Sequence, residues 1–208
     1  MSIEPGELVA VVGPPGSGRT TALLALAKRF RLSAGSVEIS GTASLGYVPD
    51  VEGPEPVFTV TEHVRERLAL LGKSRAGAGN VPLLGLDPDR QGRDLSPYEK
   101  QLLGLILARL SEPSLIALDG VDQGLDQQER EDLGRLLGEV TASGTAVLVT
   151  AREIDPASVT TVIRLPGDRH PVDNPPAPPP APVDDEDPAP AEPDEIEATE
   201  ATEPKEER

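Results

Sequence analysis

The chain has 208 residues and a formal net charge of −17, with no cysteine, no tryptophan and only two tyrosines and two phenylalanines. The lack of cysteine excludes disulfides and thiolate metal sites. The acidic surplus and the scarcity of aromatic residues argue against a nucleic-acid partner.

The length fits one ordinary domain with additional chain. Residues 171–208 are rich in proline and carry 13 acidic against 2 basic residues. Such a segment buries too little apolar surface to offset its chain entropy. We therefore expect a folded domain over 1–168 and a disordered acidic, proline-rich tail over 169–208. The tail would act either as a solubilising segment or as a docking segment for a basic partner.

The N-terminus has no basic, signal-like region, and the longest apolar stretch, residues 102–110, is too short to span a bilayer. We therefore expect a cytoplasmic protein, which another subunit could hold at the inner face of the membrane.

An apolar run at residues 8–12 leads into a glycine-rich segment, and a helix-like segment at 22–29 follows. The glycine-rich segment consists of Gly13, Pro14, Pro15, Gly16, Ser17, Gly18, Arg19, Thr20 and Thr21. Its spacing matches G-x-x-x-x-G-K-[ST] except for arginine in place of lysine. A strand, a glycine-rich turn and a helix in this order predict a phosphate-binding loop, because backbone N–H groups and the helix N-terminus face the anion. The alternative is an ordinary turn.

Two side chains of this loop bear on its ligand. The guanidinium of Arg19 is larger and more planar than an ammonium, so we expect nucleotide binding to be weaker than with lysine. Thr20 provides the hydroxyl that is expected to contact Mg²⁺.

The segments that follow alternate between β-like and helical patterns. We expect short strands at 37–39 and 45–48, a helix at 60–71, a Gly/Ala loop at 73–80 and a turn or brief helix at 83–86. In the 60–71 helix, the apolar residues Val60, Val64, Leu68 and Leu71 share one face.

The second half of the chain contains the clearer signals. Ser96, Pro97 and Glu99 are typical of a capped helix start, ahead of the apolar helix at 102–110. Further expected elements are a strand at 114–119, a helix at 127–142 capped by Asp126, and strands at 146–150 and 159–165. Alternating strands and helices predict a mostly parallel α/β sheet flanked by helices, with ligand at the carboxyl ends of the strands.

The order of these landmarks resembles the ATP-binding cassette of ABC transporters, a P-loop NTPase-type fold, over about residues 1–168. Tyr47-Val48-Pro49 resembles the strand before the Q-loop, Leu95-Ser96 the signature region, and Leu118-Asp119 with Gly124-Leu125-Asp126 the Walker B strand and D-loop. The resemblance implies a small helical subdomain at about 55–110, and ATP or ADP with Mg²⁺ as ligands. It also implies a homo- or heterodimer of cassettes, or a membrane permease subunit, as partner.

The same resemblance implies that Thr20, Asp119 and Asp50 surround Mg²⁺. The positions that carry hydrolysis in the family are replaced. Gly120 stands in place of the glutamate that polarises water, Asp50 in place of the Q-loop glutamine and Ala151 in place of the switch histidine. We therefore expect a degenerate member with weak or lost hydrolysis, and the sequence leaves open whether it is still an enzyme.

The signature segment is altered as well, because Ser96-Pro97-Tyr98-Glu99-Lys100 replaces Ser-Gly-Gly-Gln and proline has no N–H to offer a phosphate. One interpretation is a cassette that binds nucleotide and works with a permease or a second cassette. The alternative is a regulatory or scaffolding pseudo-ATPase that interacts through its acidic tail. A small-molecule kinase with a P-loop would leave residues 95–96 and 124–126 unexplained.

Overall fold

The computed structural model describes residues 3–30, 34 and 36–167. The expectations for residues 169–208 lie outside this part of the chain. Within the described residues, no helix combines the length and apolar character that a membrane span requires.

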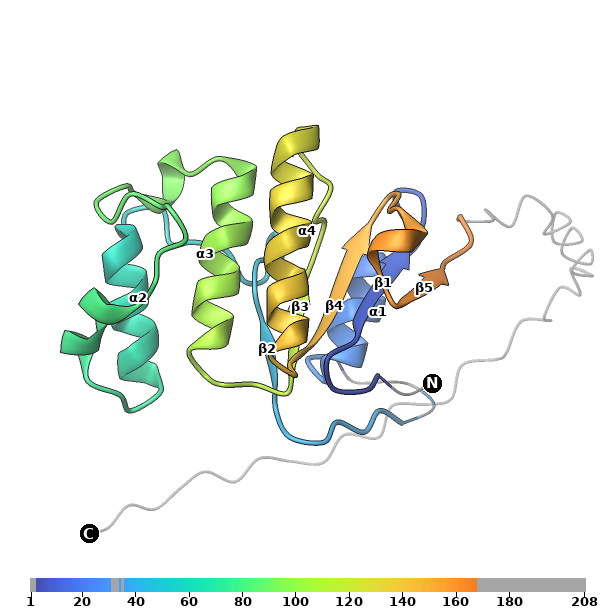
Figure 1. The fold of residues 1–208 in the computed structure, drawn as a ribbon, viewed down its shortest axis with the longest axis horizontal. Helices are drawn as coiled ribbons and strands as arrows, with labels where there is room; N and C mark the ends of the chain where they lie inside the picture. Colours follow the sequence, from blue (N-terminus) through green and yellow to red (C-terminus); the bar gives the residue numbers. More distant parts are fainter. Residues whose placement is uncertain (1–2, 31–33, 35, 168–208) are drawn as a thin grey trace, which may run out of the picture. The chain divides into compact units, whose positions relative to one another are not determined.

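The fold is built on a five-stranded parallel sheet with the order β2-β3-β4-β1-β5 (Figure 1). Its strands are β1 (Leu8–Val12), β2 (Ala43–Leu45), β3 (Leu115–Leu118), β4 (Ala146–Ala151) and β5 (Thr161–Arg164). Every residue of β1, β3 and β4 is buried. Continuous apolar runs are typical of strands that helices cover on both faces, which explains why these strands show no alternation.

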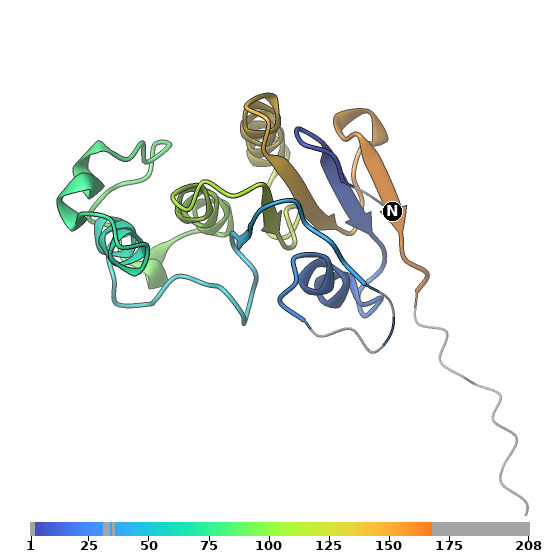
Figure 2. The ribbon, with the colours of Figure 1, turned by 90° about the horizontal axis from the view of Figure 1, so that it is seen from below.

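The helices are α1 (Arg19–Leu26), α2 (Val60–Leu70), α3 (Pro97–Arg109) and α4 (Gln127–Ala142), with short 3₁₀ helices η1 (Arg75–Asn80), η2 (Gly92–Asp94) and η3 (Pro156–Ser158). Side chains of α1 pack on one face of the sheet. Side chains of α3 and α4 pack on the other face, so the sheet lies between helical layers (Figure 2). The expected α/β fold with a mostly parallel sheet flanked by helices is confirmed.

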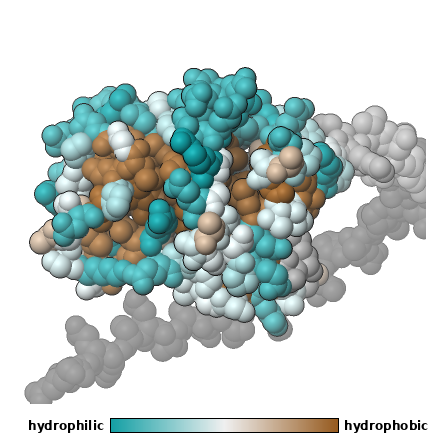
Figure 3. All heavy atoms as spheres, in the orientation of Figure 1, coloured by the Kyte–Doolittle hydropathy of each residue, from teal (hydrophilic) through white to brown (hydrophobic). Residues whose placement is uncertain are grey.

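A third hydrophobic cluster joins α2 to α3 and to the segment between them. Val60, Val64 and Leu68 are buried in it, so the apolar face of α2 packs within the molecule. In the space-filling view, hydrophobic residues gather over the region between α2 and α3 (Figure 3).

Some expected elements are displaced or absent. The segment 36–39 forms no strand, because no described strand lies beside it to pair with its backbone. The strand expected at 45–48 ends at Leu45, and Val48 makes only an isolated bridge to Glu52. The expected loop at 73–80 contains η1, and α1 begins at Arg19, earlier than its apolar pattern indicated. The helix α3 begins at Pro97, directly after the predicted Ser96 cap.

Candidate functional site

The glycine-rich segment forms a compact loop between β1 and α1. The N–H of Ser17 donates to the carbonyl of Pro14 at 3.2 Å, which closes a turn. Gly16 and Gly18 both have a φ of +81°, a backbone conformation that glycine adopts without steric cost. Gly18 is the N-cap of α1, and because it has no side chain it cannot accept a hydrogen bond from the first N–H groups of the helix.

The start of the loop is sterically tight. A Cβ added at Gly13 would lie 2.6 Å from Ser17 Oγ and 2.9 Å from the carbonyl oxygen of Leu165. The hydroxyl of Ser17 is buried and has no hydrogen-bond partner among the described residues. An unpaired hydroxyl beside free helical N–H groups is an arrangement that fits an anionic ligand.

The loop meets the end of β3 through two of the predicted site residues. The hydroxyl of Thr20 donates to Asp119 Oδ2 at 2.8 Å, although the two residues are 99 positions apart in the chain. Asp119 is only 5% exposed. Donating its proton to Asp119 leaves the lone pairs of the Thr20 hydroxyl able to bind a cation, and oxygen ligands are those that Mg²⁺ prefers.

Two further side chains hold Asp119, and the sequence analysis did not assign either to the site. The buried Thr150 hydroxyl donates to Asp119 Oδ1 and accepts the N–H of Gly120 at 2.8 Å. The buried Gln101 amide donates to the carbonyl of Asp119 at 2.8 Å. Thr150 is a polar residue at the end of an apolar run and Gln101 directly precedes one, but neither pattern indicates which group the side chain will face.

Arg19 turns its side chain back onto its own loop. Its guanidinium donates to the carbonyl oxygen of Gly13. Arg19, at the position where the motif has lysine, is therefore hydrogen-bonded to the backbone at the start of its own loop.

Asp50 lies apart from these contacts. It occupies a turn after Val48 and has a φ of +62°. The pKa of the Tyr47 phenol is raised, first by burial, then by the charge of Asp50 and then by that of Asp119. Over the described residues, no group of three or more His, Cys, Asp or Glu side chains is placed to hold a metal ion.

Gly120 and Ala151, where the family resemblance places catalytic residues, differ in their backbone settings. Gly120 directly follows Asp119 and has a φ of +63°. A Cβ at this position would lie 2.7 Å from Gln123 Nε2. Ala151 is the last residue of β4 and is 1% exposed, so its methyl group is part of the core.

The segment that resembles the family's signature region is the N-terminus of α3. The Ser96 hydroxyl accepts the N–H of Glu99 at 3.2 Å, and Glu99 Oε2 accepts the N–H of Ser96 at 2.7 Å. Glu99 Oε1 also pairs with Arg90 at 3.0 Å. The predicted capping box is confirmed, and both carboxylate oxygens of Glu99 are engaged within the chain.

The comparisons identify the family. The ABC transporter family model matches residues 1–121, which is more than half of the chain. The chain belongs to the ABC transporter family and forms its ATP-binding cassette.

Curated relatives agree with this assignment. The chain is similar to the zinc import ATP-binding protein ZnuC of Cereibacter sphaeroides, at 36% identity over 163 residues, covering 74% of this chain and 65% of that protein. The ZnuC of Paracoccus denitrificans is 38% identical over 160 residues, covering 73% of this chain and 61% of that protein. The chain thus spans somewhat less than two thirds of the length of these relatives.

Solved structures share the fold. A dimeric ATP-binding cassette in a post-hydrolysis state, bound to ADP and Pi, matches with a TM-score of 0.67 at 22% identity, covering 81% of this chain and 86% of that one. A putative metal-chelate type ABC transporter in an inward-facing conformation matches with a TM-score of 0.64 at 21% identity, covering 77% and 69% respectively.

Proposed function

We propose that the chain binds ATP or ADP with Mg²⁺ through residues 13–21, with Thr20 and Asp119 oriented toward the cation. The contact between the Thr20 hydroxyl and Asp119 is the observation that carries this proposal. It joins the loop to the carboxyl end of β3, which is distant in sequence, and ligands of parallel sheets bind at the carboxyl ends of the strands. Mg²⁺, when bound, would neutralise phosphate charge. Asp50 is proposed as a further residue near the cation, on the family resemblance alone.

We further propose that hydrolysis is weak or lost. Removing a general base costs about 10²–10⁴-fold in rate, and neither Gly120 nor Ala151 provides an ionisable group. The N-terminus of α3 adds to this, because Ser96 and Glu99 are committed to a helix cap. The chain would act with a membrane permease or in a homo- or heterodimer of cassettes, as a cytoplasmic subunit at the membrane. The ZnuC relatives make a divalent-metal importer the first system in which to look for the partner.

Thermal unfolding with and without Mg-ATP tests nucleotide binding. A ligand that binds only the native state at 100 times its Kd stabilises it by about 2.7 kcal/mol, so a clear rise in melting temperature is expected. Asp119→Asn should remove the part of this rise that requires Mg²⁺, while Glu139→Gln, an exposed carboxylate on α4, should leave it unchanged. No stabilisation at millimolar Mg-ATP would eliminate this function.

That negative result would favour the second candidate, a regulatory or scaffolding pseudo-ATPase that interacts through its acidic tail. The observation that favours it is the use of the signature residues as structural caps. A turnover assay on the purified chain separates weak from lost hydrolysis. A rate that falls with Asp119→Asn would show that the chain's own site is active.

A further inference from the structure

The proposed nucleotide site lies at the carboxyl ends of three neighbouring strands. In the sheet, β4 lies between β1, which leads into the phosphate-binding loop, and β3, which ends before Asp119. The last residue of β1 pairs with the last residue of β4 in the parallel register. The residues that follow, Gly13 and Arg152, are therefore level with each other, and Arg152 lies between the start of the loop and the end of β3.

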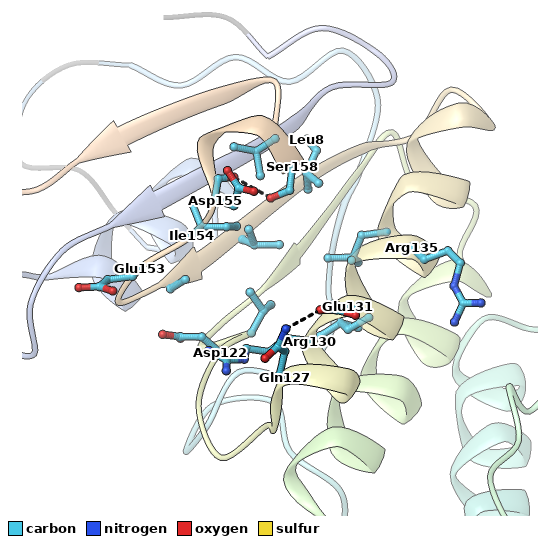
Figure 4. Close-up of a pocket in the computed structure, with 17 residues that line it drawn as sticks. Leu8, Asp122, Gln127, Arg130, Glu131, Arg135, Glu153, Ile154, Asp155 and Ser158 are labelled. Carbon is cyan, nitrogen blue, oxygen red and sulfur yellow. Dashed lines mark hydrogen bonds between the residues drawn. The ribbon is translucent and has the colours of Figure 1, made fainter.

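The side chain of Arg152 belongs to the face of the sheet that α1 covers. Along β4, Leu148 packs on the α1 face, whereas Val149 and Ala151 pack on the α4 face. The alternation continues past the end of the strand, because Glu153 lines a cavity between α4 and the segment after β4 (Figure 4), and Arg152 does not. Since successive side chains of a strand point to opposite faces, Arg152 is directed to the α1 face.

The same face carries the contacts of the proposed cation site. Thr150, two residues before Arg152, donates its hydroxyl proton to Asp119 Oδ1, and Asp119 Oδ2 accepts the hydroxyl of Thr20. The Arg152 side chain therefore begins on the side of the sheet where Thr20 meets Asp119.

The backbone of Arg152 is held in place, while its guanidinium is available. Its N–H donates to Asp122 Oδ2 at 2.9 Å, which ties the end of β4 to the loop after β3. The residue is exposed, and no hydrogen bond or ion pair within the described part of the chain engages its guanidinium. Arg19, by contrast, donates to the carbonyl of Gly13. Of these two arginines, Arg152 is the one whose side-chain donors are all available to an anion.

The loop and the cation contacts indicate which phosphate would meet Arg152. The backbone of a phosphate-binding loop holds the inner phosphates, and Mg²⁺ bridges the β- and γ-phosphates. With the cation beside Thr20 and Asp119, the terminal phosphate of ATP would lie beyond the loop toward β3, and therefore over the end of β4. ADP has no phosphate at this position.

We propose that the guanidinium of Arg152 binds the terminal phosphate of ATP, so that this chain prefers ATP to ADP. The inference rests on the proposed nucleotide-binding function and assigns a specificity-determining residue to that site. A guanidinium suits this contact, because its planar fork pairs with a phosphate through two parallel hydrogen bonds. The contact is one of binding and requires no hydrolysis.

Calorimetric titration of the full chain tests the proposal with two probes, Mg²⁺ with ADP and Mg²⁺ with adenylyl imidodiphosphate, a non-hydrolysable ATP analogue. Arg152→Ala should weaken binding of the ATP analogue by about tenfold or more, the order that a hydrogen bond to a charged group contributes. Binding of ADP should stay nearly the same, and Arg152→Lys should recover part of the loss. The melting temperature without nucleotide should not change, because the side chain is exposed.

Arg164 provides the matched control. It is an exposed arginine at the end of β5, on the side of β1 away from β3. Val162, two residues earlier, packs on the α4 face, so Arg164 is directed away from the loop. Arg164→Ala removes the same charge from the chain and should leave the affinity for both probes unchanged.

The outcomes separate this inference from the function on which it rests. If Arg152→Ala binds the ATP analogue as tightly as the unmodified chain, or loses affinity equally for both probes, Arg152 does not bind the terminal phosphate, although nucleotide binding stands. An equal loss in Arg164→Ala would reduce the effect to overall charge and would also refute the contact. If the unmodified chain binds neither probe, the nucleotide-binding function fails and this inference fails with it.

Discussion

At Gly120 the backbone disfavours a glutamate, the residue that the family resemblance places at this position. A φ of +63° lies in the left-handed region, where an L side chain costs about 1–2 kcal/mol. The side chain of Gln123 also occupies the space that a Cβ would take. The backbone conformation and the position of Gln123 therefore both disfavour a glutamate at this position.

We predict that Gly120→Glu does not create Asp119-dependent ATP turnover and lowers the stability by about 1–2 kcal/mol. Gly72→Glu is the control for the left-handed backbone conformation alone. Gly72 also has a positive φ, +69°, but an added Cβ there meets nothing within 4 Å. Turnover assays and denaturant unfolding measure the two effects. Appreciable turnover together with unchanged stability would contradict the prediction.

Thr150 holds the Asp119 carboxylate and the N–H of Gly120 through one hydroxyl. Thr150→Val keeps the shape but leaves these two buried groups without that partner, at a cost of about 1–3 kcal/mol for each. Thr150→Ser keeps the hydroxyl and should lose less. Denaturant unfolding of the unmodified chain and of the two variants measures the loss of stability. A valine variant as stable as the serine variant would mean that the hydroxyl does not contribute to stability.

Tyr47 offers a spectroscopic probe of the proposed cation site. Burial and the charges of Asp50 and Asp119 raise the pKa of its phenol above the usual 10.0. The stabilisation linked to this shift is complete below pH 10 and is lost as the pH rises through the native-state pKa.

In a Tyr98→Phe background only Tyr47 titrates, because the chain has two tyrosines. The ultraviolet absorbance of tyrosinate should show that Asp50→Asn lowers the pKa of Tyr47. Mg²⁺ with ADP should lower it too, since the cation would offset the nearby carboxylate charges. A titration curve that is insensitive to both changes would place Tyr47 away from the cation.

Among single residues, the meeting of Thr20 and Asp119 could be expected from the sequence, because the loop and strand-end motifs have fixed spacing. The roles of Gln101 and Thr150 could not, since nothing in their runs shows which buried carbonyl or carboxylate they will face. The return of the Arg19 guanidinium to Gly13 is likewise a matter of side-chain geometry.

At the scale of elements, three helices begin with the same reciprocal cap, in which a hydroxyl or carboxylate at the N-cap and a glutamate at N3 satisfy each other's N–H groups. Ser96 to Glu99 and the Asp126 cap were readable from the sequence, and Thr59 with Glu62 shows the same spacing. The strand expected at 37–39 was wrong, because alternation alone does not provide a neighbouring strand.

Ser96→Ala should destabilise the protein by about 1 kcal/mol, within a range of about 0.5–2 kcal/mol, because it removes the acceptor for the N–H of Glu99. Ser74 is the matched control. It precedes η1 with an extended backbone but makes no side-chain cap, so Ser74→Ala should be nearly neutral. Thermal unfolding compares the two, and equal losses would show that the cap bond is not what stabilises α3.

At the scale of the whole molecule, the parallel sheet with helices on both faces follows from alternating apolar strands and helices, and the sequence predicted it. The order of the strands depends on which runs pair across the chain, and no local pattern specifies that. The apolar clusters of the described residues all lie between Ile3 and Leu165. Residues 171–208 bring few aliphatic side chains and a net charge of about −11 from 13 acidic and 2 basic residues.

We therefore predict that deleting residues 171–208 leaves the melting temperature and its rise with Mg-ATP almost unchanged, because the core and the phosphate-binding loop lie upstream. If the scaffolding function is correct, the same deletion should abolish binding of a basic partner, for which oligolysine serves as the probe in a titration at low salt. A deletion of the last ten residues, 199–208, serves as a partial control and should weaken oligolysine binding less. A fall of several degrees in melting temperature on deleting 171–208 would show instead that this segment contributes to the folded domain.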